Sequence, residues 1–487
     1  MVILPNTIPG PTYRLAPVRF WQMARFAADS VGIATDLFGR YGSLVALSHG
    51  GGTQIYSPEP DCPGTVLVKG RDANRQIAQQ SDVFYKYPLS GRLYRYRDRS
   101  PRHAPLHHFG VGLFGANEGE HQQQRQLLMP VFGKAALESY WPAMVAIART
   151  EIDRWPLGEV IDVAAALGAL AAQLVTRILL GAVGSERARE LLQRSLHTLG
   201  QPGVHLLPFA WPGLPFRQLL AEMAALDEEM RTLISQARSV PANGDRQSII
   251  ARLLTAHDPE TGHTLSEVEI LGHVGSFFAA GHETSANALT WTLLLLSQHP
   301  DTAAALDEEV ASLGTDPPTL AAISALPQLD RIVQESLRAL SPVPWNGRVV
   351  SRETELLGYP LPAGTEIMAS LHHTHHDPEL YPQPRRFDPD RWLDSSPDPF
   401  GYVPFSAGPR TCIGRGFAVL EIKLVLALIC QRYRLQFVPT VPIDRRGFIT
   451  LSPAQGLPMR VCQRDRQFQL GVGDVQGNVH ELVDLPT

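Results

Sequence analysis

Apolar residues recur every three to four positions over long stretches of this chain, which is the spacing of an amphipathic α-helix. The pattern predicts long helices over residues 135–155, 163–180, 219–237, 266–299 and 326–340. Short runs of β-branched and aromatic residues predict strands over 43–47, 65–68, 348–357, 365–370 and 448–451. We therefore expect a mainly α fold in which strands far apart in the chain pair in a small sheet.

Length and composition indicate a globular protein with a large core. The chain has 487 residues, of which 44% are hydrophobic and 19% are charged, and neither share is typical of a disordered or fibrous protein. No linker, charge block or repeat marks a boundary, so we expect a single domain over 1–487. The last segment, 463–487, is polar without periodicity, and the pattern assigns it no role.

Charge and cysteine content restrict the partners and the compartment. The formal net charge of -5 gives the whole chain no attraction for nucleic acid. The four cysteines are too few and too scattered for a disulfide framework, which indicates a reducing compartment and leaves thiols free to bind a metal. Charged residues (Arg14, Arg19, Arg25 and Asp29) interrupt every apolar stretch near the N-terminus. We therefore expect no membrane anchor and a cytoplasmic protein.

Four histidines stand close together at His372, His373, His375 and His376. Adjacent histidines in one short segment rarely converge on a tetrahedral metal without other ligands. We interpret them as loop residues and not as a zinc site.

The most informative segment is Phe405-Ser-Ala-Gly-Pro-Arg-Thr-Cys412-Ile-Gly414, which a helical pattern follows directly. It places a thiol at the N-terminus of a helix, where backbone N–H groups and the helix dipole stabilise an anion. Gly408 and Gly414 permit a tight loop around the sulfur. The sequence therefore predicts that Cys412 favours its thiolate form and serves as a metal ligand.

A second unusual segment, Ala280-Gly-His-Glu283-Thr284-Ser285, lies inside the longest predicted helix. Gly281 costs about 1 kcal/mol relative to alanine, which suggests close approach of a ligand or a local distortion of the helix. Thr284 can bond to a carbonyl one turn earlier and open the helix to a water, while Glu283 can relay protons.

Two further groups of residues depend on spacing. Glu335 and Arg338 lie three apart on one helix face, a pairing worth only about 0.2–0.5 kcal/mol in isolation, and Arg391 follows in a Pro-rich loop. His121 and Arg125 lie four apart on one face of a predicted helix, so both can reach one anion.

These motifs resemble, in type and in order, those of the cytochrome P450 family. The cysteine segment fits Phe-x-x-Gly-x-Arg-x-Cys-x-Gly, and the helix segment fits (Ala/Gly)-Gly-x-(Asp/Glu)-Thr-(Thr/Ser). The resemblance covers most of the chain, from the region of Phe84 to the strand near Thr450. It implies a mainly α fold with a small β-rich lobe and a haem between the long central helix and the cysteine loop.

The resemblance also implies roles for single residues. Cys412 would ligate the haem iron, and Glu283 and Thr284 would serve dioxygen protonation. Further haem contacts are implied for Phe405, Arg410, His121, Arg125, Arg348, Gly414 and Ala280. A structural triad is implied for Glu335, Arg338 and Arg391. Substrate contacts are implied for Phe277, Trp345, Phe448 and Ile449.

The function that the resemblance implies is that of a monomeric monooxygenase with haem b. It would insert one oxygen atom from O₂ into a hydrophobic small molecule, because the substrate-facing positions are bulky and apolar. No flavin or nicotinamide domain fits in the remaining sequence, so electrons would come from an external ferredoxin or flavodoxin with its reductase.

Two alternatives stay open. One is a haem-thiolate enzyme with other chemistry (peroxygenase, isomerase or oxidative coupling), against which Glu283 and Thr284 argue. The other is a non-enzymatic haem sensor or carrier, in which that pair would have no role.

Overall fold

The structure is a computed structural model that describes most of the chain. The described residues are 3–12, 16–47, 49, 52–59, 61–87, 93, 100–181, 186–201, 203–204, 207, 209–239, 247–314, 317–394, 396–447 and 449–486. Phe448, one of the predicted substrate contacts, lies outside them.

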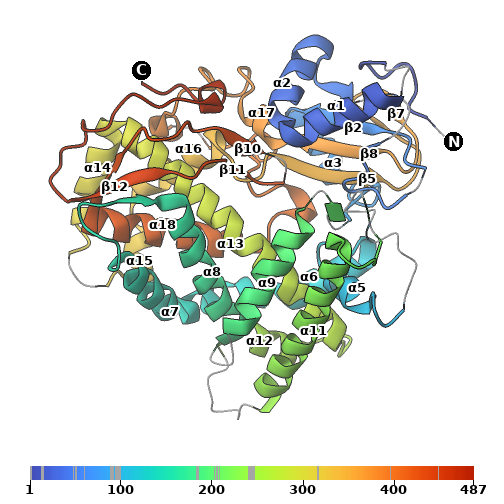
Figure 1. The fold of residues 1–487 in the computed structure, drawn as a ribbon, viewed down its shortest axis with the longest axis horizontal. Coiled ribbons are helices and arrows are strands. Elements are labelled where there is room, and N and C mark those ends of the chain that lie inside the picture. Colours follow the sequence, from blue (N-terminus) through green and yellow to red (C-terminus); the bar gives the residue numbers. More distant parts are fainter. Residues whose placement is uncertain are drawn as a thin grey trace.

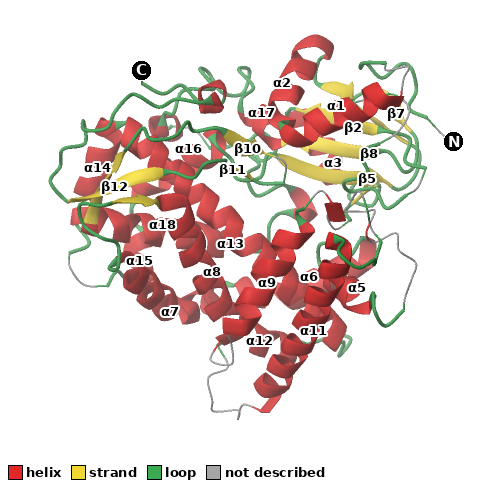
Figure 2. Ribbon diagram, in the orientation of Figure 1, coloured by secondary structure: helices red, strands yellow, loops and turns green. Residues whose placement is uncertain are grey.

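Helices make up most of the molecule (Figures 1 and 2). They are α1 (Ala16–Ala28), α2 (Ser30–Tyr41), α3 (Arg71–Gln79), α5 (Ala104–Gly110), α6 (Glu118–Leu128), α7 (Lys134–Ile152), α8 (Val163–Leu180), α9 (Glu186–Leu199), α11 (Pro215–Ser239), α12 (Ile249–Thr255), α13 (Glu267–Gln298), α14 (Pro300–Ala311), α15 (Leu320–Ser324), α16 (Pro327–Ala339), α17 (Leu371–His375) and α18 (Arg415–Arg432). The five long helices predicted from periodicity are confirmed as α7, α8, α11, α13 and α16, with ends shifted by a few residues.

The strands form one five-stranded sheet, which makes a small lobe, and three smaller sheets (Figure 2). The five-stranded sheet has the order β1 (Leu44–Ala46), β2 (Thr65–Lys69), β8 (Glu366–Ser370), β5 (Trp345–Val350) and β3 (Phe84–Tyr85). The remaining strands are β4 (Val160–Asp162), β6 (Thr354–Leu356), β7 (Tyr359–Leu361), β9 (Tyr433–Phe437), β10 (Arg445–Gly447), β11 (Leu451–Pro453) and β12 (Pro458–Gln463). Strand β2 pairs in parallel with β8, about 300 residues later, as expected for strands far apart in the chain.

Helix α13 runs through the middle of the helical part (Figure 1). It begins with a capping box in which Ser266 accepts from the Glu269 N–H at 3.3 Å while the Glu269 carboxylate accepts from the Ser266 N–H at 2.7 Å. Its second half is almost entirely buried against α8, α16 and α18. Helix α8 is the one described helix long and apolar enough to cross a membrane, and 56% of its residues are buried in this core.

Two local predictions are wrong in detail. Of the strand predicted over 448–451, residues 449–450 form a bend and only Leu451 is in a strand, as the first residue of β11. The four histidines are not in a loop but on the short helix α17 and its end, and three of them are fully or almost fully buried. Among the described residues, no three His, Cys, Asp or Glu side chains are placed to hold a metal ion.

The C-terminal segment, 464–486, packs against the body of the protein. Val479 and Val483 are fully buried, and Gln298 at the end of α13 bonds to Gly471 O at 3.0 Å and to Gly473 N at 2.8 Å. The sequence pattern did not predict this packing, because the segment is mostly polar and only a few valines and leucines, at irregular spacing, make the contact.

Candidate functional site

The cysteine loop is a tight turn that leads into α18. Cys412 lies between a 3-10 turn over Gly408–Arg410 and the first turn of α18, and its N–H donates to Phe405 O at 2.9 Å. Gly408 has a φ of +67°, and a Cβ there would lie 3.0 Å from the Ala78 Cβ. Only glycine adopts this conformation at this distance without strain.

The surroundings of Cys412 act on its pKa in both directions. Burial raises the pKa of the thiol, whereas the Gly414 N–H and the charges of Lys86, Arg125 and Arg415 lower it, with a net rise. The prediction that Cys412 favours its thiolate form does not hold for the chain without a metal, because burial outweighs the Gly414 N–H and the nearby positive charges. A cation bound to the sulfur would supply the missing stabilisation. A Cβ at Gly414 would lie 4.0 Å from the Cys412 Sγ, so glycine there leaves space beside the sulfur.

Three arginines converge near the cysteine from different elements. Arg125 of α6 donates to Thr411 O at 2.9 Å, next to Cys412. Arg410 of the cysteine loop reaches back to the start of α6 and donates to Ala116 O at 2.6 Å. Arg348 of β5 is buried and donates to the Gly347 carbonyl at 2.8 Å. These are the arginines that the sequence assigned to the haem.

These arginines and Lys86 form a cation cluster beside His121, and the pKa of each of these five residues is lowered. Burial is the largest cause for each, and the mutual repulsion of the positive charges adds to it for most of them. The pKa falls to about 4 for His121, to about 9 for Arg348 and to about 10 for Arg410. No carboxylate is among the causes of these shifts, and among the described residues none forms an ion pair with a member of the cluster.

The cation cluster and Cys412 together fit a haem. Buried like charges without a partner are costly, and an anion with two carboxylates, such as the propionate edge of haem b, would balance them. The thiol lies close enough to feel the charges of Lys86 and Arg125, so one flat ligand can reach both. Lys86 was missed in the sequence because it belongs to no motif and follows a strand of only two residues.

The predicted oxygen-activating residues lie on α13, which stays a continuous helix through this segment. Thr284 Oγ1 donates to Ala280 O at 2.5 Å, one turn earlier, as its position predicted. Glu283 is exposed and accepts a 2.6 Å hydrogen bond from Thr450 Oγ1 in the β10–β11 turn. Thr450 was not singled out in the sequence, because the two residues are 167 positions apart and no pattern connects them.

The reason for Gly281 differs from the expected one. A Cβ at this position would lie 3.0 Å from the Cγ2 of Val175 on α8. The glycine therefore serves the close packing of α8 on α13, and neither a ligand nor a helix distortion is needed to explain it.

Glu335, Arg338 and Arg391 lie together around one carboxylate. Glu335 and Arg338 are fully buried, and they form two parallel hydrogen bonds of 2.9 and 2.8 Å. Arg391 Nε and Trp392 Nε1 each donate to the same carboxylate at 3.0 Å. Arg338 Nη1 donates to the carbonyls of His375 and Pro384, and Nη2 donates also to the carbonyl of Arg386. Every charge in this triad has a partner.

The three predicted substrate residues that the structure describes do not lie together. Trp345 is 3% exposed, and its indole N–H donates to Ser30 Oγ at 2.8 Å within the core of the β-rich lobe. Phe277 packs edge-on against Phe132 at a centroid distance of 5.1 Å. Ile449, at 40% exposed, lies at the turn that contacts Glu283 through Thr450.

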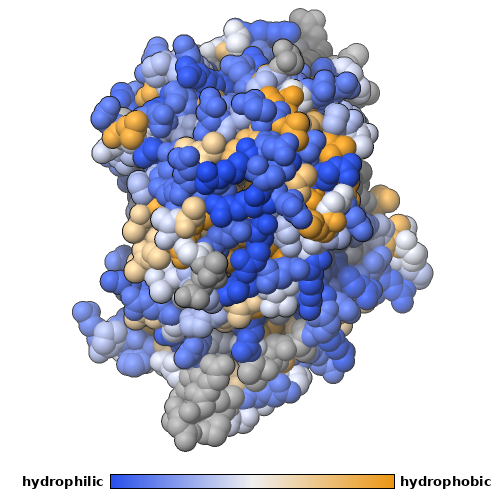
Figure 3. All heavy atoms as spheres, turned by 90° about the vertical axis from the view of Figure 1, so that its left-hand side faces the viewer, coloured by the Kyte–Doolittle hydropathy of each residue, from blue (hydrophilic) through white to orange (hydrophobic). Residues whose placement is uncertain are grey.

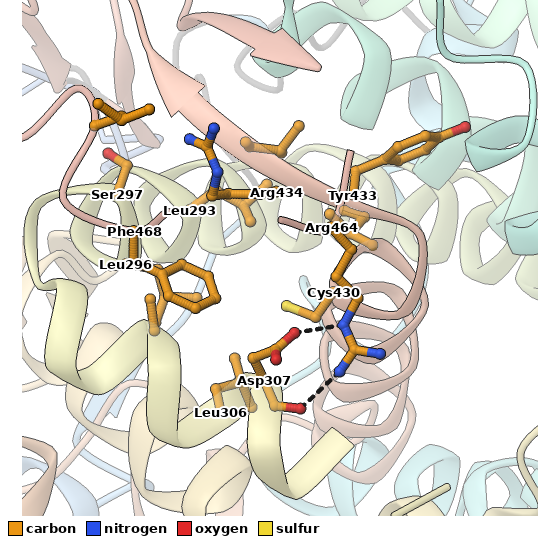
Figure 4. Close-up of a pocket in the computed structure, with 14 residues that line it drawn as sticks. Leu293, Leu296, Ser297, Leu306, Asp307, Cys430, Tyr433, Arg434, Arg464 and Phe468 are labelled. Atoms are coloured by element: carbon orange, nitrogen blue, oxygen red, sulfur yellow. Dashed lines mark hydrogen bonds and ion pairs between the residues drawn. The ribbon is translucent and has the colours of Figure 1, made fainter. Parts of the chain in front are cut away.

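A separate pocket lies between α13, α14, α18 and the C-terminal segment (Figure 4). Phe468 and Cys430 face it, and Arg464 closes one side through its ion pair with the buried Asp307. Figure 3 shows this side of the molecule, where apolar side chains surface among mostly hydrophilic ones. The residues that line the pocket include none of the predicted site residues, so it is not the haem site.

Comparison with known proteins agrees with this geometry. The family model described as Cytochrome P450 matches residues 90–456. Cyclooctatin synthase of Streptomyces melanosporofaciens is 32% identical over 73% of this chain and 79% of its own length. Cyclooctat-9-en-7-ol 5-monooxygenase of the same organism is 32% identical over 66% of this chain and 72% of its own length.

Solved structures show the same fold. The haem domain of cytochrome P450DA covers 96% of this chain with a TM-score of 0.76 and 23% identity. A cyanobacterial cytochrome P450 with bound retinoic acid covers 95% with a TM-score of 0.79 and 22% identity. With the family match over residues 90–456, these findings show that the chain belongs to the cytochrome P450 family, the oxidoreductases that carry haem b on a cysteine thiolate.

Proposed function

We propose that this enzyme inserts one oxygen atom from O₂ into a C–H bond, or across a C=C bond, of a hydrophobic small molecule. Electrons would come from a separate ferredoxin or flavodoxin with its reductase, and the protein would work as a cytoplasmic monomer. The observation that carries the proposal is the Glu283–Thr284 pair on the helix that crosses the middle of the fold.

In this proposal Cys412 holds the iron, and haem bound through a thiolate supplies the chemistry of O–O cleavage. Thr284 Oγ1 donates its own hydrogen to Ala280 O, so its lone pairs are available to accept a hydrogen bond from a water in the pocket. Glu283, which is exposed and adjacent, would pass protons from solvent to that water. The Thr450 hydroxyl holds the Glu283 carboxylate in place.

The hydrophobic substrate class is supported by the walls near the site and by the relatives. Phe109, Leu113, Phe277 and Ile413 are partly buried apolar residues packed along the core beside α13 and the cysteine loop. One Streptomyces relative is named for the oxidation of cyclooctat-9-en-7-ol, and one solved neighbour holds retinoic acid. Both names denote largely hydrocarbon molecules with one polar group.

The test combines a spectrum with isotope labelling. The reduced carbon monoxide complex should show the red-shifted Soret band of a thiolate ligand, and Cys412→Ala should lose it. Terpenoid alcohols and retinoids would then be screened by the spin-state shift, and any that binds would be turned over under ¹⁸O₂. One ¹⁸O atom per product is expected.

Variants of Thr284 separate the proposal from other haem-thiolate chemistry. Thr284→Ala should divert most electrons to peroxide, with a loss of product of about tenfold or more, whereas Thr284→Ser should keep product formation. Equal product from Thr284→Ala, or product that contains no ¹⁸O, would contradict the proposal and favour a peroxide-driven or isomerising enzyme.

A further inference from the structure

Lys86 is tied to the start of α6 by a single amide side chain. It follows β3, and its backbone N–H donates to Asn117 Oδ1 at 2.9 Å. The Asn117 amide N–H donates in return to Lys86 O at 2.9 Å. The segment that carries Lys86 is therefore fixed to the residue that precedes the His121 helix.

The same amide also holds Arg410 of the cysteine loop. Arg410 Nη2 donates to Asn117 Oδ1 at 2.6 Å, and Asn117 Nδ2 donates to Gly115 O at 3.0 Å as well. Asn117 thus sets the position of two cations that come from chain segments more than 300 residues apart. An asparagine suits this place because it accepts on one side, donates on the other and brings no charge.

The Lys86 ammonium lies within the cation cluster. Its Nζ is 4.8 Å from the centre of the Phe114 ring. Burial and the charges of Arg348 and Arg410 lower the Lys86 pKa to about 7, with Cys412 acting in the opposite direction. Among the described residues, no carboxylate forms an ion pair with Lys86. An ammonium beside two guanidinium groups, with no acid of its own among the described residues, is stabilised by an anionic ligand.

We propose that Lys86 binds a haem propionate, and that Asn117 is the positioning residue that aligns Lys86 with Arg410 for this contact. Two propionates bring two negative charges, and four cations, from the segment after β3, from α6, from β5 and from the cysteine loop, all lie close enough to His121 to lower its pKa. Lys86 would then contribute to the retention of haem, not to the chemistry of the substrate.

The experiment compares haem b with haem dimethyl ester, in which both propionates are uncharged. Holoenzyme is reconstituted with each, and the rate of haem transfer to an excess of haem-free myoglobin is measured. Lys86→Met should speed the loss of haem b about tenfold or more, the value of one charge-assisted hydrogen bond. It should leave the loss of the dimethyl ester unchanged, and Lys86→Arg should restore retention of haem b.

Two further variants complete the design. Lys134→Met, at a surface lysine with a side chain 88% exposed, is the matched control and should change neither rate. Asn117→Asp places a negative charge beside Arg410, so it should speed the loss of haem b but not of the ester. The reduced carbon monoxide spectrum of each variant should keep its red-shifted band, which reports an intact thiolate. Equal acceleration with both haems, or no acceleration with haem b, would overturn the proposal.

Discussion

Two groups of buried arginines in this protein differ in how their charge is balanced. In the triad, Arg338 and Arg391 share the Glu335 carboxylate, and no donor of Arg338 is left without an acceptor. In the cation cluster, Arg348 and Arg410 have only carbonyl and amide oxygens as partners. The difference indicates that the triad is complete within the chain, whereas the cluster is built for a ligand.

Two other buried groups show further solutions to the same problem. Glu421 on α18 is fully buried, and burial raises its pKa to about 8, so it is neutral at pH 7. The histidines of α17 stay neutral as well, because burial lowers the pKa of His373 to about 3 and that of His376 to about 4. A buried charge is thus balanced by an ion pair in the triad and by a ligand in the cation cluster. It is removed by protonation at Glu421 and by loss of a proton at the histidines. Each case predicts a different response to mutation or pH.

The largest effect is expected where the partner lies inside the chain. Glu335→Gln leaves the fully buried Arg338 and the nearby Arg391 without a counter-charge, which should lower the free energy of unfolding by about 3–5 kcal/mol. Urea unfolding followed by circular dichroism measures this. Glu353→Gln, at an exposed position, should change it by less than about 0.5 kcal/mol. A loss in Glu335→Gln as small as that of the control would contradict the account of the triad.

The histidines of α17 should make stability depend on pH on the acid side. Their folded pKa lies below the unfolded value of 6.5, so the unfolded state binds more protons as the pH falls. The contribution of the neutral histidines to the free energy of unfolding should be fully present above pH 6.5 and should be lost towards pH 4. For His376 alone this loss is about 3 kcal/mol, at 1.4 kcal/mol per pKa unit. Thermal unfolding between pH 7.5 and 5 measures the slope.

His375→Gln provides the control for that slope. The Val403 N–H donates to His375 Nε2 at 2.9 Å, and protonation of the ring would break this bond. Glutamine keeps an acceptor but does not titrate. The variant should therefore lose less stability than the wild type over the same range, and an unchanged slope would show that the acid sensitivity arises elsewhere.

Glu421→Gln should give an effect of opposite sign. The folded pKa of about 8 exceeds the ordinary value of 4.5, so the glutamate favours the unfolded state increasingly as the pH rises from 4.5 to 8. The variant should be more stable than the wild type by about 4 kcal/mol at pH 8, at the same 1.4 kcal/mol per pKa unit, and equal to it at pH 4.5. A difference that does not grow with pH would mean that Glu421 is ionised in the folded protein.

The sequence identified the parts of the site that short motifs encode. Local chemistry already singled out Cys412 at a helix start and Thr284 inside a helix, whereas the spacing of Glu335 and Arg338 gained its meaning only from the family resemblance. Lys86, Asn117 and Thr450 act only through contacts with residues far along the chain, and neither propensity nor spacing marks them.

Residue type also misled where packing decided the outcome. The family resemblance implied that Trp345 faces substrate, yet it fills the core beside Phe26 and Ser30. Gly281 suggested a ligand, but Val175 of a neighbouring helix explains it. In both cases the deciding neighbour lies on another element, which periodicity does not reveal.

The smallest expected effect gives the most direct comparison of the two arginine groups. In haem-free protein, Arg348→Met removes a buried charge that Arg410 repels and that burial penalises. The free energy of unfolding should therefore stay within about 1 kcal/mol of the wild type or rise. Arg338→Met should instead lower it by about 3 kcal/mol or more, because it strands the buried Glu335. Urea unfolding of both variants measures the difference.

If Arg348→Met were as damaging as Arg338→Met in the absence of haem, the charge of Arg348 would be balanced by the chain itself. The cluster would then be a structural element like the triad, and its open charge could no longer be taken as the mark of the haem site.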